Sequence, residues 1–203
     1  MNLETTIKQA SQILKKHNIH TYELDAQLIL SDIMKVERES LITNNEAVIS
    51  EKIMEKYDIA IRRRIRREPV AYIIGKKEFW SHNFRVNHST LIPRPESELL
   101  IYKLVNYFKN RRINILDIGT GSGCILLSLL KELHLSRGTG IDISSEAVKT
   151  AQLNSKKLNS LRIDNIIHPV PVPISKIFIF LFLKKFTTLY IKSSVSGLGI
   201  SVS

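Results

Sequence analysis

The stretch that most constrains the fold runs from residue 113 to residue 142. It reads INILDIGTGSGC, followed by an apolar segment from Ile125 to Leu133 and then by TGID, which ends at Asp142. An apolar run, a glycine-rich loop, a helix and a second short strand that closes on an acid make one βαβ nucleotide-binding unit. The sequence therefore predicts an α/β fold with a parallel, Rossmann-like sheet that holds a cofactor at the loop.

Each residue type in this unit has a physical purpose. Gly119, Gly121 and Gly123 allow positive φ angles and let a ligand approach where a Cβ atom would collide. The loop leads into a helix N-terminus, whose free N–H groups favour an anionic ligand. Asp142 is placed to accept hydrogen bonds from two ribose hydroxyls, while Asp117 is placed to orient the loop or to accept from a ligand ammonium.

The spacing of the glycines bears on which cofactor binds. A dinucleotide loop, G-x-G-x-x-G, requires a glycine at position 124, where this chain has Cys124. The chain instead reads G-x-G-x-G, the spacing associated with S-adenosylmethionine in Rossmann-like methyltransferases. NAD, and a glycine-rich turn without a ligand, remain alternatives. Cys124 stands where a small core residue is needed, and we interpret it as packing and not as a nucleophile.

Composition sets the broad class of the protein. Hydrophobic residues at 43% and charged residues at 24% are typical of a globular chain that buries a core. A single cysteine excludes an internal disulfide framework and fits a reducing compartment. The N-terminus lacks the basic and apolar regions of a secretory signal. These features predict a cytoplasmic protein without a membrane segment.

The net charge of +11 comes mainly from the second part of the chain and the tail. Residues 76–165 carry 14 basic and 8 acidic side chains, and residues 166–203 carry 4 and 0. Such an excess suits a nucleic-acid or ribosome-associated partner, and it is equally consistent with a genome whose codon bias supplies lysine.

Residues 1–74 show apolar positions at helical spacing and predict a small helical bundle that serves for substrate recognition or as a lid. The run from Arg62 to Arg67 ends its last long helix. A solvated helix end that compensates the helix dipole is favoured there over a phosphate-binding patch. Residues 75–90 alternate like a β-hairpin and are interpreted as a linker. Trp80 within it could stack on a substrate, although packing is the commoner role for a lone aromatic side chain.

Four blocks together resemble the peptide-chain release factor glutamine methyltransferases. They are REPVAYIIG at 67–75, EFW at 78–80, TLIPRPE at 90–96 and LDIGTGSG at 116–123. The match in order and spacing covers residues 1 to about 155, and it is far more specific than the glycine loop alone.

The resemblance implies a helical N-terminal domain joined by a hairpin to a Rossmann-like methyltransferase domain. It implies transfer of a methyl group from S-adenosylmethionine to the side-chain amide of the glutamine in the Gly-Gly-Gln loop of release factors. No membrane, metal or direct nucleic-acid partner is expected. The cofactor-binding residues that it implies are Gly119, Thr120, Gly121, Ser122, Gly123 and Asp142. Pro93, Arg94 and Pro95 resemble a wall on the substrate side.

The second half of the family pattern is absent from this sequence. Family members orient the amide with an Asn-Pro-Pro-Tyr motif after the fourth strand, but this chain has no Asn-Pro and no Pro-Pro step. We therefore expect an incomplete methyltransferase domain over residues 91–165 and an atypical tail over residues 166–203. A frameshifted or decayed gene is one expectation for this tail, and a genuine lineage-specific tail is the other. A partner chain could complete the sheet.

Three functions follow from these observations. The first is methylation of release factors, for which this chain lacks the family residues that hold the amide. The second is a non-catalytic remnant or S-adenosylmethionine-binding module. The third is methylation of amino groups on nucleic-acid bases, whose enzymes use a similar motif; the helical N-terminal domain favours the protein substrate.

Overall fold

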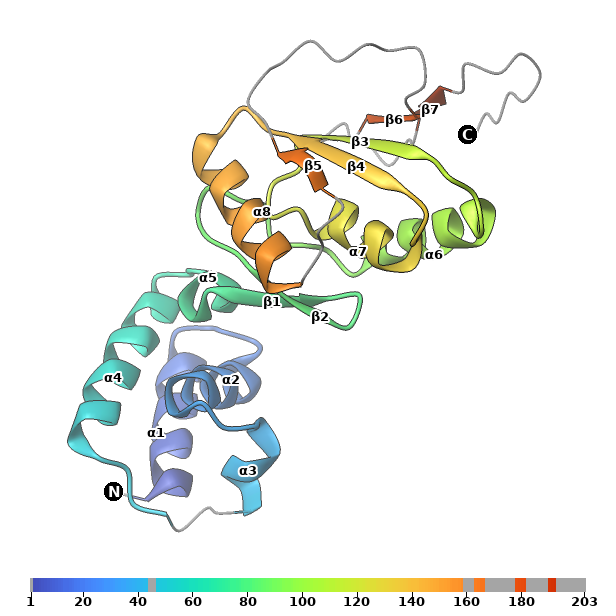
Figure 1. The fold of residues 1–203 in the computed structure, drawn as a ribbon. Coiled ribbons are helices and arrows are strands. Elements are labelled where there is room, and N and C mark those ends of the chain that lie inside the picture. The colour runs from blue at the N-terminus through green and yellow to red at the C-terminus, as the bar shows by residue number, and fades with distance from the viewer. Residues whose placement is uncertain (1, 44–46, 159–162, 167–177, 182–189, 193–203) are drawn as a thin grey trace. The chain divides into compact units, whose positions relative to one another are not determined.

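The computed structural model describes residues 2–43, 47–158, 163–166, 178–181 and 190–192. The chain divides into two compact units, Met1–Gly75 and Lys76–Ser203 (Figure 1). Each unit has its own cluster of buried hydrophobic residues. No helix in the described part of the chain has the length and apolar composition needed to cross a bilayer.

The first unit is the helical bundle that the sequence predicts. Its helices are α1 (Leu3–Lys16), α2 (Tyr22–Met34), α3 (Arg38–Thr43), α4 (Glu51–Ile65) and α5 (Val70–Ile74). Asn2 caps α1 by accepting a hydrogen bond from the backbone N–H of Thr5 at 2.9 Å. The buried side chains of α1, α2 and α4, including Leu14, Leu30 and Tyr57, form the core.

The arginine run at the end of α4 is bound within its own unit. The Arg64 Nε donates to the Asp25 carboxylate at 2.7 Å, and Arg63 forms two hydrogen bonds with the Glu68 carboxylate. Arg67 donates to the main-chain carbonyls of His17 and Asn18, both at 2.9 Å. Three members of the run therefore have structural partners, which supports the helix-end interpretation over a dedicated phosphate patch.

The second unit begins with an antiparallel hairpin of β1 (Lys76–Phe79) and β2 (His82–Arg85). Its two-residue turn is Trp80–Ser81, and both residues have positive φ, at 51° and 57°. Two acids hold the turn: Glu98 accepts from the Trp80 backbone N–H at 2.8 Å, and Glu132 accepts from the indole Nε1 at 2.7 Å. Trp80 therefore serves to anchor the hairpin.

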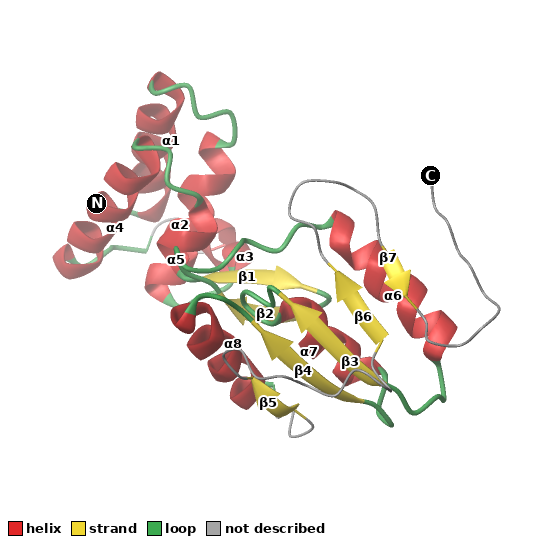
Figure 2. Ribbon diagram, turned by 90° about the horizontal axis from the view of Figure 1, so that it is seen from above, coloured by secondary structure: helices red, strands yellow, loops and turns green. Residues whose placement is uncertain are grey.

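The remaining elements are three helices and the five strands of one sheet. They are α6 (Glu96–Phe108), β3 (Asn114–Ile118), α7 (Cys124–Glu132), β4 (Arg137–Ile141), α8 (Ser145–Lys157), β5 (Ile163–Ile166), β6 (Phe178–Leu181) and β7 (Tyr190–Lys192). The strand order is β5-β4-β3-β6-β7, in which only β7 runs antiparallel to its neighbour (Figure 2). This confirms the predicted α/β class with a parallel Rossmann-like sheet.

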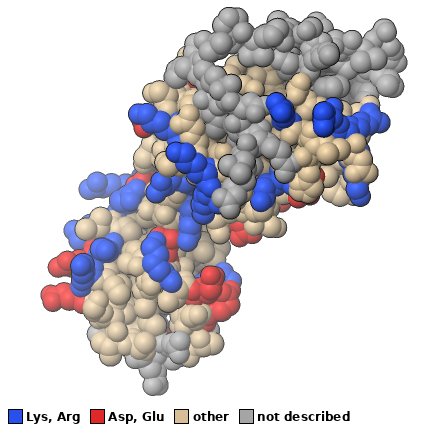
Figure 3. All heavy atoms as spheres, in the orientation of Figure 1, with Lys and Arg blue, Asp and Glu red and all other residues tan. Residues whose placement is uncertain are grey.

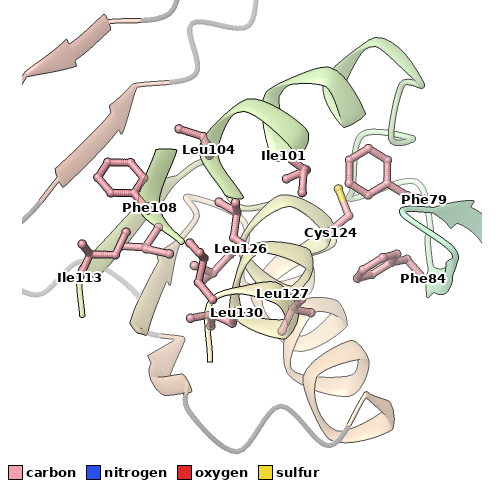
Figure 4. Packing of buried hydrophobic residues seen from close by; sticks show 13 residues of the cluster. Phe79, Phe84, Ile101, Leu104, Phe108, Ile113, Cys124, Leu126, Leu127 and Leu130 are labelled. Carbon is pink, nitrogen blue, oxygen red and sulfur yellow. The ribbon is translucent and has the colours of Figure 1, made fainter. Parts of the chain in front are cut away.

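The core of the second unit lies between the sheet and its helices. Phe79 and Phe84 of the hairpin pack edge to face and reach the same cluster as Ile101 of α6 and Leu127 of α7 (Figure 4). The hairpin that the sequence presents as a linker thus contributes two buried aromatic rings to this core. Cys124 is buried in the cluster, as the sequence predicts.

Helices α6, α7 and α8 lie on one side of the sheet (Figure 1). Burial along the central strands alternates accordingly: Ile115 and Asp117 of β3 are buried, whereas Leu116 and Ile118 are half-exposed. The second face of the sheet is therefore less well covered than the first.

The predicted tail is described only in part. The apolar run at 177–183, for which the sequence left a buried strand and an aggregation-prone segment open, contains β6 beside β3. The proline-rich stretch at 168–173 lies outside the described residues. On the face drawn in Figure 3, Lys and Arg side chains are scattered over the described surface of the second unit with few acids among them, whereas the helical unit shows both signs of charge more evenly.

Candidate functional site

The glycine loop lies at the point where the strand order of the sheet reverses. It follows β3, which has β4 on one side and β6 on the other, and both neighbours run parallel to it. In open parallel sheets, ligands bind beyond the carboxyl ends of the strands at such a switch point. The topology therefore puts residues 119–123 where a cofactor site belongs.

Three glycines in the left-handed region shape this loop. The φ angles of Gly119, Gly121 and Gly123 are 77°, 58° and 77°. The backbone N–H groups of Gly119 and Thr120 both donate to the carbonyl of Ile141, at 2.8 and 3.0 Å. The last residue of β4 thus fixes the start of the loop.

Asp142 secures the other side of the loop. Its Oδ2 accepts from the backbone N–H of Gly121 at 2.8 Å, and its Oδ1 accepts from that of Ser144 at 2.9 Å. The side chain is half-buried. The predicted ribose acid is therefore held in one orientation by the main chain on either side of it.

Asp117 is buried below the loop. Its Oδ2 accepts a hydrogen bond from the Thr120 hydroxyl at 2.8 Å. Burial raises the pKa of the Asp117 carboxyl to about 6 from 3.8; the Thr120 hydrogen bond opposes this shift, and the charge of Asp142 adds to it. A carboxyl with this pKa changes charge just below neutral pH.

The structure separates the predicted cofactor residues into two groups. Gly119 is exposed, and Gly121 and Asp142 are half-buried, so these residues can meet a ligand. Thr120, Ser122 and Gly123 are buried. A Cβ on Gly123 would lie 3.1 Å from the Cβ of Ala151, so this glycine is required for packing against α8. A Cβ on Gly119 would meet nothing within 4 Å.

The segment before α6 approaches the loop. The backbone nitrogen of Leu91 lies 3.9 Å from the position of a Cβ on Gly121. Of the predicted substrate-side residues, Pro93 is buried, whereas Arg94 and Pro95 are exposed. The Arg94 carbonyl accepts from the backbone N–H of Ser97 at 3.0 Å at the start of α6. The prolines and this turn fix the course of the backbone at Arg94.

Two further residues at the site were not singled out from the sequence. Ile143, next to Asp142, is 96% exposed, although an isoleucine normally avoids water. Asn154 of α8 is 1% exposed and donates to the carbonyl of Ser122 at 2.8 Å. Asn154 lies three residues after Ala151 and seven after Ala147, on the apolar stripe of its helix. A polar residue within that stripe was the available signal.

Cys124 is buried at the start of α7, directly after the glycine loop. Burial raises the pKa of the Cys124 thiol to about 12, which keeps it protonated at neutral pH and unreactive. Among the described residues, no group of three or more His, Cys, Asp or Glu is placed to hold a metal ion.

A parallel sheet with a G-x-G-x-G loop after one strand and an acid after the next defines a Rossmann-like methyltransferase domain. In agreement, residues 109–168 match the family described as "Methyltransferase domain", and residues 5–75 match "PrmC N-terminal domain". Curated relatives named "Release factor glutamine methyltransferase" resemble both parts. The chain belongs to the release factor glutamine methyltransferase family.

Three such relatives show the extent of the similarity. The protein of Buchnera aphidicola subsp. Schizaphis graminum is 40% identical over 159 residues, which is 78% of this chain and 57% of that protein. Those of Koribacter versatilis and Aliivibrio fischeri are 38% and 32% identical, over 76% and 77% of this chain and 57% and 55% of theirs. The chain spans a little more than half the length of these relatives.

Proposed function

We propose that the second unit binds S-adenosylmethionine. We further propose that the chain takes part in methylating release factors, on the side-chain amide N5 of the glutamine in their Gly-Gly-Gln loop. The observation that carries the cofactor proposal is the arrangement of Asp142 against the glycine loop. The names of the relatives, and the match of the helical unit, support a release factor as the protein substrate.

Asp142 keeps the capacity to bind a ribose diol. A carboxylate oxygen can accept two hydrogen bonds, and each Asp142 oxygen accepts one from the main chain. One lone pair on each oxygen therefore remains for one of two adjacent hydroxyls. Because the two N–H groups fix the carboxylate plane, the diol meets an acceptor pair that is already oriented.

Ile143 and Gly119 would contact other parts of the same ligand. An apolar side chain that is 96% exposed beside the ribose acid can cover the face of an adenine ring. The open space at Gly119 admits the part of the ligand that extends along the loop. When bound, S-adenosylmethionine supplies a methyl group on a positively charged sulfur, and ionised Asp117 and Asp142 favour a positive ligand nearby.

Methyl transfer also requires residues that hold the acceptor amide. Its nitrogen is a poor nucleophile because the lone pair is delocalised, so an enzyme must orient the amide and stabilise positive charge that develops on it. The chain has no Asn-Pro-Pro-Tyr motif for this purpose. This absence favours a second candidate, a cofactor-binding module without transfer. The helical unit argues against a nucleic-acid base as acceptor. For either candidate we infer a cytoplasmic protein, because release factors act there.

The test combines calorimetric binding of S-adenosylhomocysteine with transfer of labelled methyl groups to a purified release factor. We expect Asp142→Asn to weaken binding at least 10-fold, because the ribose loses a charged acceptor. Glu146→Gln, which removes an exposed acid in the first turn of α8, close to Asp142 in sequence, is the matched control and should bind like wild type. Binding without transfer supports the module, and the absence of both contradicts the proposal.

A further inference from the structure

One buried side chain joins the glycine loop to the hairpin. Asn154 uses its Nδ2 group to donate to the Ser122 carbonyl at 2.8 Å and to the Arg85 carbonyl at 2.9 Å. Its Oδ1 accepts from the Arg85 backbone N–H at 2.7 Å. With 1% of its surface exposed, this amide is shielded from water that could replace these partners.

The two segments that it joins are far apart in sequence. Ser122 belongs to the proposed cofactor loop, whereas Arg85 ends β2 and pairs with Lys76 of β1. Lys76 directly follows Gly75, the last residue of the helical unit. Asn154 therefore binds the hairpin at its base, where the chain leaves the proposed substrate-recognition unit.

Two other side chains of α8 form hydrogen bonds with β2 or with the residues just after it. Thr150 accepts from the Asn87 side chain at 2.9 Å, and the Lys157 Nζ donates to the Asn83 carbonyl at 3.0 Å. Packing also presses α8 against the loop, since Ala151 fills the space beside Gly123. Among these residues, Asn154 has hydrogen bonds to both segments.

We propose that Asn154 is a positioning residue that couples the glycine loop to the base of the hairpin, so that the two segments open and close together. The partners of the Asn154 amide are the carbonyls of Ser122 and Arg85 and the N–H of Arg85. If the amide is removed, these backbone groups need other hydrogen-bond partners. A ligand that binds the loop and suppresses its opening then also suppresses opening of the hairpin. The consequence for the cofactor rests on the proposed function, whereas the coupling itself does not.

Native-state hydrogen exchange on the full chain without ligand tests the coupling. The amide of Arg85 donates to Asn154 and reports the loss of that bond, that of Gly123 reports the loop through its bond to Thr120, and that of Leu133, at the end of α7, is a reference outside both segments. We expect Asn154→Ala to accelerate exchange of both Arg85 and Gly123 about 10-fold or more relative to Leu133. Lys157→Met removes an exposed tether to the same strand and should leave Gly123 unchanged.

Acceleration of Arg85 alone overturns the proposal, because the loop would then be held by other contacts. If Asn154→Ala does not fold, Asn154→Asp provides the same test: it can still accept from Arg85 but cannot donate to Ser122, so Gly123 should again exchange faster. Calorimetry with S-adenosylhomocysteine separates the two claims. Wild type that fails to bind contradicts the proposed function, whereas the exchange data decide the role of Asn154 independently.

Discussion

Asp117 makes the stability of the second unit depend on pH. Its pKa is raised by burial to about 6 in the folded protein, so the stability it contributes is complete below about pH 4 and is lost as the pH rises through 6. The loss amounts to about 3 kcal/mol, at roughly 1.4 kcal/mol per pKa unit. Asp117→Asn removes this loss and keeps an acceptor for Thr120.

We therefore expect Asp117→Asn to match wild type near pH 4 and to exceed its free energy of unfolding by up to about 3 kcal/mol at pH 7. Urea unfolding at both pH values measures the difference. The variant should nevertheless bind the positively charged cofactor less tightly at pH 7. A difference in stability that does not change with pH would place the titration elsewhere.

A substitution at Gly119 tests ligand access to the loop without disturbing the packing around it. Gly119→Ala meets no neighbour but forces alanine to a φ of 77°, which should reduce stability by about 1 kcal/mol. Its methyl group enters the open space assigned to the ligand, so affinity for S-adenosylhomocysteine should fall about 10-fold or more. Gly123→Ala is the comparison: its Cβ would press on Ala151 and Leu127, and it should lose more stability. Equal affinity for wild type and Gly119→Ala would mean that the ligand does not pass there.

In the helical unit, the ion pair between α2 and α4 invites a test. Asp25 is 5% exposed and accepts from Thr21 and from Arg64. Arg64→Met leaves a buried carboxylate without its cation, and we expect it to reduce stability by roughly 3 kcal/mol. Arg62→Met, on the exposed face of the same helix, should change stability by less than about 0.5 kcal/mol.

Urea unfolding of both variants provides the measurement. The double variant Asp25→Asn/Arg64→Met should recover most of the loss, because no buried charge then remains unpaired. If Arg64→Met unfolds like Arg62→Met, the ion pair contributes no net stability to the helical unit.

The elements that sequence patterns predicted are those whose information is local. The spacing of Leu3, Ala10 and Leu14 predicts helix α1, and the spacing of the glycines after an apolar strand predicts the cofactor loop. The hairpin turn could not be found in this way. Two-residue hairpin turns favour Asn and Gly, yet here Trp80 and Ser81 adopt positive φ, and Glu98 and Glu132 from two helices both bind Trp80.

The residues of the candidate site also divide into those that local sequence patterns predict and those that depend on distant contacts. The loop and Asp142 were predictable because cofactor chemistry demands those residue types in that order. The roles of Asn154 and Leu91 depend on contacts between segments that are distant in the sequence. The apolar stripe of its helix marks Asn154 as unusual, but the sequence does not identify its partners. The pairing of β6 with β3 is likewise non-local, and no periodicity in residues 177–183 specifies its partner.

At the scale of the whole molecule, we expect the less well covered face of the sheet to determine whether the protein self-associates. Parallel sheets are normally covered on both sides, but Leu116, Ile118 and Ile141 are half-exposed. We expect self-association that increases with protein concentration, or dependence on a partner chain that covers this face. Light scattering over a range of concentrations measures it. A stable monomer with a cooperative melt at every concentration would contradict the prediction.

A single substitution can assign such self-association to the sheet. Leu116→Lys puts a charge on the half-exposed face and should shift the protein toward the monomer. Leu153→Lys, on the exposed surface of α8 on the other side of the sheet, makes the same change away from this face and should leave association as in wild type.

The bonds that the glycine loop makes with β4 and Asp142 also determine how a cofactor arrives. Because Gly119, Thr120 and Gly121 already donate to these fixed acceptors, the loop has its binding geometry before any ligand is present. Little chain entropy is then lost on capture. Association should be a single second-order step whose observed rate rises linearly with ligand concentration, without the plateau that a slow rearrangement imposes.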